Sequence, residues 1–137
     1  MNYWLLKSEP SSYSWDQLVK DGRTHWDGVR NHQAANNLKA MKRGDRAFFY
    51  HSGEGPAIVG VAEIVKEAFP DPSDEGSRFV MVDVRPLQAA KTPVTLAAIK
   101  AEPKLAQLAL VRQGRLSVVP VSAEEWRILS KMAGLKA

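Results

Sequence analysis

The middle of the chain is a succession of short apolar segments with no long helical segment between them. Residues 47–51, 58–65 and 79–84 are rich in aromatic and β-branched side chains. A glycine turn separates the first two, and the proline- and aspartate-rich loop 70–76 separates the last two. Strands that follow one another in this way favour an α+β protein over a doubly wound parallel sheet, in which strands alternate with helices.

Further strands and short helices are expected on both sides of this central run. Residues 3–7 and 116–121 have strand character, and Gly60 inside a strand predicts a bulge or the close approach of another group. A helix is expected near 31–42, with Gly44 as its C-terminal cap. Other helix starts are predicted at Ser14, Thr95, Pro103 and Ser122. About five or six strands and four or five short helices fit a small mixed β-barrel, partly open, with helices at its mouth.

Length and composition favour one domain over residues 1–137. Apolar residues make up 45% of the chain and charged residues 25%, which is ordinary for a globular protein. The chain has no cysteine, which excludes disulfides, thiolate metal sites and a thiol nucleophile. The first apolar run stops at Leu6, which is too short for a signal sequence or a membrane span. We therefore expect a cytoplasmic protein.

The formal net charge of +4 is unevenly distributed along the chain. Residues 1–50 have 8 basic and 5 acidic side chains, residues 51–83 have 2 and 7, and residues 84–121 have 6 and 1. If the two basic segments come together in space, they form a positive face suited to phosphates. The alternative is a mixed, solvated surface.

The sequence contains none of the common catalytic or metal-binding motifs. A phosphate-binding loop, the G-x-G-x-x-G fingerprint and the G-x-S-x-G elbow are all absent. The three histidines, His25, His32 and His51, include no pair with i, i+4 spacing, so we expect no metal site and no cofactor. Asp27 beside His25 is interpreted as a turn residue.

Residues 26–31, with the sequence W-D-G-V-R-N, form the most informative stretch. A tryptophan in a glycine-containing loop is well placed to stack on a nucleobase. Arg30 can bind a carbonyl or phosphate with two hydrogen bonds, and Asn31 can offer both a donor and an acceptor to a base edge. In the alternative interpretation, Trp26 covers the core and Arg30 forms a salt bridge.

Three other segments place polar side chains at strand ends. The candidate binding residues there are Lys7, Ser8, Glu9, Tyr50, His51, Ser52, Arg115 and Ser117. Because successive side chains of a strand alternate between faces, residues 50–52 cannot all line one cavity unless a bulge reorients them. The alternative is that Tyr50 packs in the core and His51 bonds a backbone carbonyl. Together these groups suit recognition of a planar polar ligand better than bond cleavage.

Five blocks in these regions resemble the EVE domain family, which includes the thymocyte nuclear protein type and small stand-alone bacterial proteins. The blocks are Y-W-L-L-K-S-E-P at 3–10, W-D-G-V-R-N at 26–31, G-D-R-A-F-F-Y-H-S at 44–52, I-V-G-V-A-E-I-V at 58–65 and V-R-Q-G-R-L-S-V at 111–118. They occur in order over nearly the whole chain. The resemblance implies a PUA-like mixed β-barrel related to YTH domains, and a pocket for a modified base such as 5-methylcytosine.

The leading hypothesis is a non-catalytic module that binds DNA or RNA carrying a modified base, with that base flipped into an aromatic pocket. Trp26 would stack on the base, Asn31, Ser8, Ser52 and Ser117 would read its polar edge, and Lys7, Arg30 and Arg115 would approach phosphate or an exocyclic oxygen. A second hypothesis is an enzyme acting on a nucleoside-like metabolite, with Glu9 or Asp27 as the general base and His51 as its partner. A third is an RNA-binding domain without specificity for a modified base.

Overall fold

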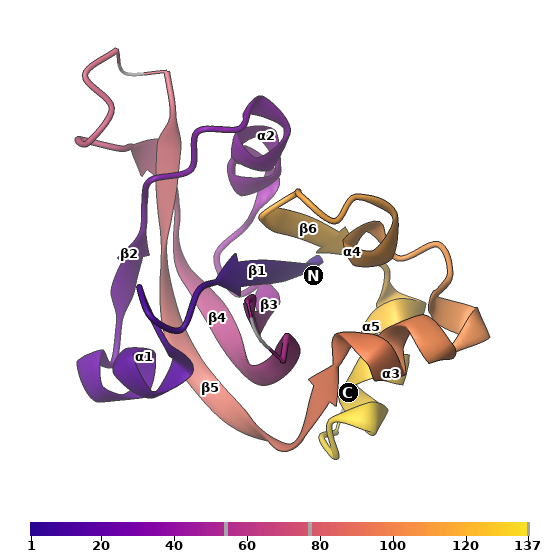
Figure 1. The fold of residues 1–137 in the computed structure, drawn as a ribbon. Coiled ribbons are helices and arrows are strands. Elements are labelled where there is room, and N and C mark those ends of the chain that lie inside the picture. The colour runs from indigo at the N-terminus through magenta and orange to yellow at the C-terminus, as the bar shows by residue number, and fades with distance from the viewer. Residues whose placement is uncertain (54, 77, 137) are drawn as a thin grey trace.

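The protein is built around one mixed, curved sheet, as the computed structural model shows for residues 1–53, 55–76 and 78–136 (Figure 1). The described strands are β1 (Tyr3–Ser8), β2 (Thr24–Trp26), β3 (Arg46–His51), β4 (Ala57–Pro70), β5 (Val80–Thr95) and β6 (Val118–Val121). Their order in the sheet is β2-β5-β4-β3-β1-β6. Only β1 and β3 are parallel among the described pairs, so the sheet is mixed, which confirms the predicted α+β class.

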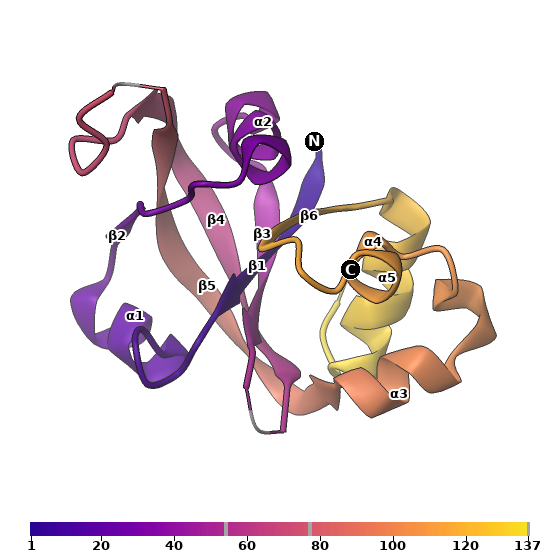
Figure 2. The same ribbon diagram turned by 45° about the horizontal axis from the view of Figure 1, so that its top comes forward.

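Short helices cover the sides of this sheet. They are α1 (Trp15–Asp21), α2 (His32–Ala40), α3 (Leu96–Ala101), α4 (Ala109–Arg112), α5 (Ala123–Met132) and a 3₁₀ turn, η1 (Pro103–Leu105). Helix α1 lies on one side of the strands and helices α3 to α5 gather on the other, as two different views show (Figure 2). Within the described part of the chain, no helix is both long enough and apolar enough to cross a membrane.

The helix starts follow the capping residues that the sequence provides. The side chains of Ser14, Thr95 and Ser122 each accept a hydrogen bond from a backbone N–H in the first turn of the following helix. At Ser122 the bond is reciprocal, because the Glu125 carboxylate accepts from the Ser122 N–H, forming a capping box. Pro103 begins η1, as predicted.

The second helix ends earlier than the sequence suggested. Its C-terminal cap is Met41, and the expected cap Gly44 lies three residues further on, where its φ is +93° and its N–H donates to the Ile64 carbonyl. The glycine is therefore needed for the turn into β3 rather than for ending the helix, and the prediction of a Gly44 cap was wrong.

Gly60 fulfils both predictions made for a glycine inside a strand. The pairing of β4 is irregular beside Gly60, on the β5 side between Ile58 and Gly60. The indole of Trp15 also packs directly on Gly60, so that a Cβ there would lie 2.6 Å from three ring atoms. Trp15 in turn contacts Phe49 edge to face at 5.5 Å between ring centroids. The absent side chain thus lets α1 approach the sheet.

Candidate nucleic-acid interface

A pocket of about 510 Å³ opens where β1 and β2 end and β6 is about to begin. This volume lies within the range of small-molecule sites. We call it the base pocket. Its lining residues come from four separate segments: Lys7, Ser8, Glu9, Ser12, Tyr13, Thr24, His25, Trp26, Asp27, Gly28, Val29, Arg30 and Ser117. Of the predicted site residues, Lys7, Ser8, Glu9, Trp26, Arg30 and Ser117 are thus brought together.

Trp26 forms an aromatic wall of the pocket. It is the last residue of β2, where it pairs with Val82 of β5, so it lies at a strand end rather than in the expected loop. Its ring is half-buried and meets Phe49 edge to face at 5.5 Å and Tyr13 at 6.4 Å. The indole is therefore anchored to the core and still borders the open pocket.

The other wall is tied to the turn that precedes β6. The Lys7 ammonium donates to the Gly114 carbonyl at 2.7 Å, and the Lys7 backbone N–H donates to the Ser117 carbonyl at 3.0 Å. Burial lowers the pKa of the Lys7 ammonium. The Ser8 hydroxyl donates to the Tyr13 carbonyl, which fixes the loop after β1. Residues from the two basic segments of the chain therefore do meet at this pocket.

Arg30 is positioned by a buried carboxylate that sequence reasoning did not identify. Asp71 is 1% exposed and accepts hydrogen bonds from the Gly28 N–H at 2.9 Å and from Arg30 Nη1 at 3.2 Å. Arg30 also donates to the Ser73 hydroxyl at 2.9 Å. Burial opposes ionisation of Asp71, but hydrogen bonds from Ser73, Gly28 and Arg30 outweigh it and lower its pKa to about 2. Asp71, ionised at neutral pH, therefore ties the 28–30 segment to the loop between β4 and β5.

The three predicted residues at the end of β3 lie outside the base pocket. Tyr50 is only 3% exposed and packs in the core, as the alternative interpretation held. His51 Nε2 accepts a hydrogen bond from the Trp15 backbone N–H at 3.0 Å, rather than donating to a carbonyl. Burial lowers the pKa of His51, and the charge of Asp16 opposes this shift. Ser52 donates its backbone N–H to the Ser8 carbonyl at 2.9 Å.

The enzyme hypothesis requires Glu9 or Asp27 to act together with His51. Glu9 and Asp27 line the base pocket, whereas His51 is not among the described residues that line it. Its Nε2 lone pair is already occupied by the Trp15 N–H. No hydrogen bond joins His51 to Glu9 or Asp27 among the described residues, so their pairing as an acid–base couple stays a hypothesis.

Asn31 and Arg115 line a neighbouring hollow rather than the base pocket. Asn31 is the N-terminal cap of α2, and its side-chain oxygen accepts from the Ala34 N–H at 2.9 Å. Arg115 is exposed in the turn between α4 and β6. Among the described residues, no group of three or more histidine, aspartate and glutamate side chains is arranged to hold a metal ion.

Sequence reasoning also missed Tyr13, Thr24 and the His25–Asp83 pair. The Tyr13 hydroxyl donates to Asp21 at 2.8 Å, which orients its ring beside the pocket.

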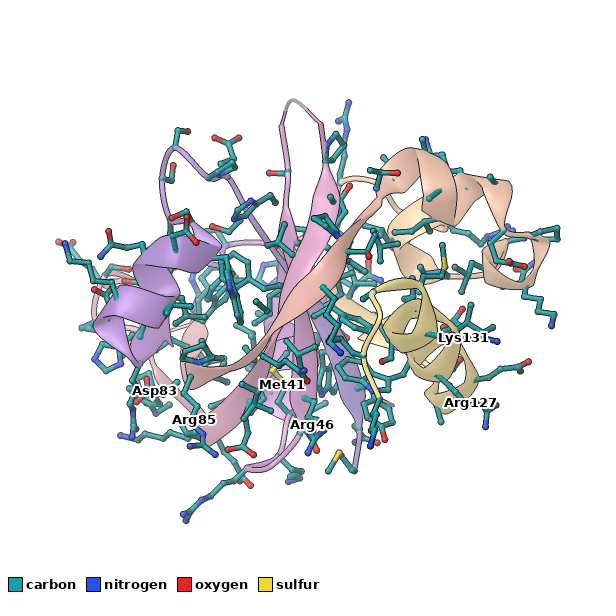
Figure 3. All side chains as sticks on the ribbon, turned by 90° about the horizontal axis from the view of Figure 1, so that it is seen from below. Met41, Arg46, Asp83, Arg85, Arg127 and Lys131 are labelled. Atoms are coloured by element: carbon teal, nitrogen blue, oxygen red, sulfur yellow. The ribbon has the colours of Figure 1, made fainter. Side chains whose placement is uncertain are left out.

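His25 bonds the buried Asp83 directly across from it on β5, and Arg23 donates to the same carboxylate at 2.7 Å. Although burial opposes it, these two donors lower the pKa of Asp83. Figure 3 shows Asp83 on the side of the strands where α1 lies. Strand β2, which carries Thr24 and His25, has only three residues and is too short to give a periodic signal.

A curved mixed sheet with short flanking helices and a polar, aromatic-walled pocket at its strand ends defines a small PUA-like binding module. A family model described as "EVE domain" matches residues 2–132, and the chain belongs to this family.

Known proteins resemble the chain over most of its length. The thymocyte nuclear protein 1 of Rattus norvegicus is 38% identical, over 91% of this chain and 70% of that protein. The NMR structure of Rpa0253 from Rhodopseudomonas palustris is 58% identical, with a TM-score of 0.93 over 98% of this chain and 94% of that one. The crystal structure of human THYN1 protein in complex with DNA containing 5-methylcytosine is 33% identical, with a TM-score of 0.91 and full coverage of both chains.

A YTH domain, that of Zygosaccharomyces rouxii MRB1 protein, shares the fold alone. It was solved in complex with N6-methyladenosine RNA, is 14% identical and has a TM-score of 0.57 over 99% of this chain and 87% of that one.

Proposed function

We propose that this protein is a non-catalytic module that binds nucleic acid carrying a 5-methylcytosine-like base, with that base flipped into the base pocket. The observation that supports this most directly is Trp26, an anchored indole that borders a pocket of about 510 Å³ rather than filling the core. The relative solved with 5-methylcytosine DNA supports the same ligand class, since it matches the whole chain.

The pocket offers the groups that a cytosine ring needs. A base can stack on the Trp26 indole, because every base has a π-face. The Glu9 carboxylate is a candidate acceptor for the exocyclic amine of cytosine, a pairing that suits acidic side chains. The hydroxyls of Ser8 and Ser117 line the same pocket and are candidates for the remaining polar edge.

The energetics predict that unmodified bases bind weakly. Extracting a base from its stack costs a few kcal/mol, and stacking on one aromatic ring returns about 1–3 kcal/mol. Contact of the pocket with the added methyl group contributes about 0.8 kcal/mol if the methyl is fully buried. The cost of unstacking the base and the gain from stacking in the pocket nearly cancel. Discrimination between methylated and unmethylated bases therefore depends on the methyl contact and on hydrogen bonds to the base edge.

The test is the substitution Trp26→Ala. We expect it to weaken binding to a single-stranded DNA carrying one 5-methylcytosine by about 1–3 kcal/mol, the value of one lost stack. Trp26→Phe is the matched control, since it keeps an aromatic face and the contact with Phe49, and should lose much less. Fluorescence-anisotropy titration at fixed salt measures both, and thermal unfolding shows whether each variant is folded.

Unchanged affinity of a folded Trp26→Ala variant would contradict the proposal. Equal affinity of the wild-type protein for the methylated and unmethylated strands would contradict it as well. RNA strands of the same sequence, with and without a modified base, are titrated at the same salt because phosphate binding depends steeply on salt. Equal binding to both RNA strands would favour the RNA-binding alternative.

A further inference from the structure

A second hollow lies beside the base pocket, between the N-terminal turn of α2 and the turn that joins α4 to β6. It has a volume of about 380 Å³. Its lining is rich in side-chain amides and contains one arginine: Asn31, Gln33, Gln113, Gly114, Arg115 and Leu116. We call it the carboxamide groove.

The carboxamide groove and the base pocket are adjacent. Arg30 of the pocket precedes Asn31 of the groove, and Ser117 of the pocket follows Arg115 by two residues. The contact of Lys7 Nζ with the Gly114 carbonyl at 2.7 Å joins the two linings directly. A nucleic-acid strand that places one nucleotide in the base pocket can therefore place the next nucleotide in the groove.

The groups in the groove are suited to a nucleotide. Each carboxamide presents a donor and an acceptor side by side, which is how glutamine and asparagine read base edges. Asn31 uses its oxygen as the helix cap, so its amide group is left to donate. Arg115 is exposed and forms no ion pair with any described residue, so its guanidinium can meet a phosphate.

The opposite side of the base pocket is unsuited to a phosphate chain. There the loop between β4 and β5 contains three acidic residues, Asp71, Asp74 and Glu75, against one basic residue, Arg78, and Arg30 is already engaged by Asp71 and Ser73. This loop projects past the segment that joins β2 to α2 (Figure 1). Like charges repel a phosphate there, which leaves the carboxamide groove as the favourable path.

We propose that the carboxamide groove holds the nucleotide next to the modified base on the same strand. Gln33 and Gln113 read the edge of its base, and Arg115 binds its phosphate. This inference rests on the proposed function, because it requires a base in the base pocket. It gives the protein a preference for the sequence that surrounds the modified base.

Two variants separate the two roles of the groove. Arg115→Gln should weaken binding of a methylated single strand about tenfold for every neighbouring base, the size of one charge-assisted contact. It should also make the slope of log K against log salt concentration shallower by about 0.7, the value of one phosphate contact on a single strand. The double variant Gln33→Ala/Gln113→Ala should instead remove the dependence of affinity on the identity of the neighbouring bases.

The matched control is Arg127→Gln. Arg127 is also exposed and forms no ion pair with a described residue, but it lies on α5, away from Asp83 and the α1 side of the strands (Figure 3). It lines a separate hollow and should leave binding unchanged. The free nucleoside 5-methyl-2′-deoxycytidine is titrated in parallel, and its affinity should be the same for all variants.

The outcomes distinguish the inference from the function on which it rests. If the wild-type protein prefers the methylated strand, but Arg115→Gln behaves like Arg127→Gln and the glutamine variant keeps its neighbour preference, the carboxamide groove is not a nucleotide site. If the wild-type protein shows no preference for the methylated strand, the proposed function itself fails. A loss of nucleoside affinity in the groove variants would also overturn the inference, since the damage would then lie in the base pocket.

Discussion

Asp71 illustrates how a side chain outside the base pocket sets the pocket's shape. It lies in a loop, yet it is nearly inaccessible to solvent and accepts bonds from two residues of the 28–30 segment. Gly28 has a φ of +75°, so this segment bends in a way that ordinary residues rarely adopt, and the Asp71 bond satisfies its N–H. The bonds are charge-assisted, which makes them stronger than neutral ones. The orientation of Arg30 therefore depends on the ionisation of Asp71.

The pH dependence of stability should reveal this role. Because the folded pKa of Asp71 is about 2, below its usual 3.8, its stabilising effect is complete above 3.8 and is lost as the pH falls toward 2. Asp71→Asn should therefore lower the free energy of unfolding by about 2 kcal/mol at neutral pH. Urea unfolding of wild type and variant measures the difference, which should shrink at a pH of about 2.5.

The control for this prediction is Asp27→Asn, a substitution of an exposed aspartate in the neighbouring segment. It should change stability by less than about 0.5 kcal/mol. An Asp71→Asn penalty that stays constant between neutral and acid pH would show that the carboxylate charge is not the stabilising factor.

At the scale of elements, the contact between α1 and the sheet depends on one missing side chain. The Trp15 indole occupies the space where a Cβ of residue 60 would stand, and Trp15 itself is buried. Gly60 lies in β4, paired with β3 on one side and β5 on the other, so its backbone cannot move away. The loop that carries pocket residues Ser12 and Tyr13 leads directly into α1.

Gly60→Ala should consequently destabilise the protein. Overpacking of a buried contact costs about 1–3 kcal/mol, which should appear as a lower midpoint of thermal unfolding. Gly114→Ala is the matched control, because no atom lies within 4 Å of its added Cβ, and its midpoint should hardly change. Adding Trp15→Phe to Gly60→Ala should recover part of the loss, since the smaller ring frees space. Equal midpoints for the two alanine variants would show that Trp15 moves aside without cost.

Elements that depend on local chemistry could be predicted from the sequence, and those that depend on distant pairing could not. Capping at Ser14, Thr95 and Ser122 involves residues three apart, so the helix starts were visible. The strand expected at 79–84 extends to Thr95, because pairing with β4 continues through an exposed, proline-containing stretch. Such a stretch has no alternating apolar pattern from which its length could be predicted.

At the scale of the whole molecule, the candidate site is assembled by topology. Strand β1 lies between β3 and β6, which brings residues 7–9 beside the turn at 114–117. Composition and spacing identified the polar ends of these segments but not which of them meet. The hydrogen bond from the Gly28 N–H to Asp71 joins residues 43 apart in the sequence, and no local sequence pattern predicts it. Six predicted residues therefore line the base pocket, while Tyr50, His51 and Ser52 face other parts of the fold.

The charge of the molecule is also arranged unevenly around the base pocket. Three cations belong to the two linings: Lys7 and Arg30 in the base pocket, and Arg115 in the turn between α4 and β6. Asp74 and Glu75 belong to the loop on the other side. Only a few cations are thus available to a strand that enters the pocket, in contrast to proteins that follow a duplex through many phosphate contacts.

This arrangement predicts a shallow dependence of binding on salt. Three phosphate contacts on a single strand give a slope of about −2 for log K against log salt concentration, at about 0.7 per contact. The ratio of affinities for methylated and unmethylated strands should stay constant over the same range, because a methyl contact and a stack release no counterions. Titrations of both strands at several sodium chloride concentrations measure the slope and the ratio together.

A slope steeper than about −4 would mean that the strand follows a much longer basic surface than the three cations beside the pocket provide. A ratio that falls with salt would instead mean that discrimination arises from the phosphates, contrary to a base held against Trp26.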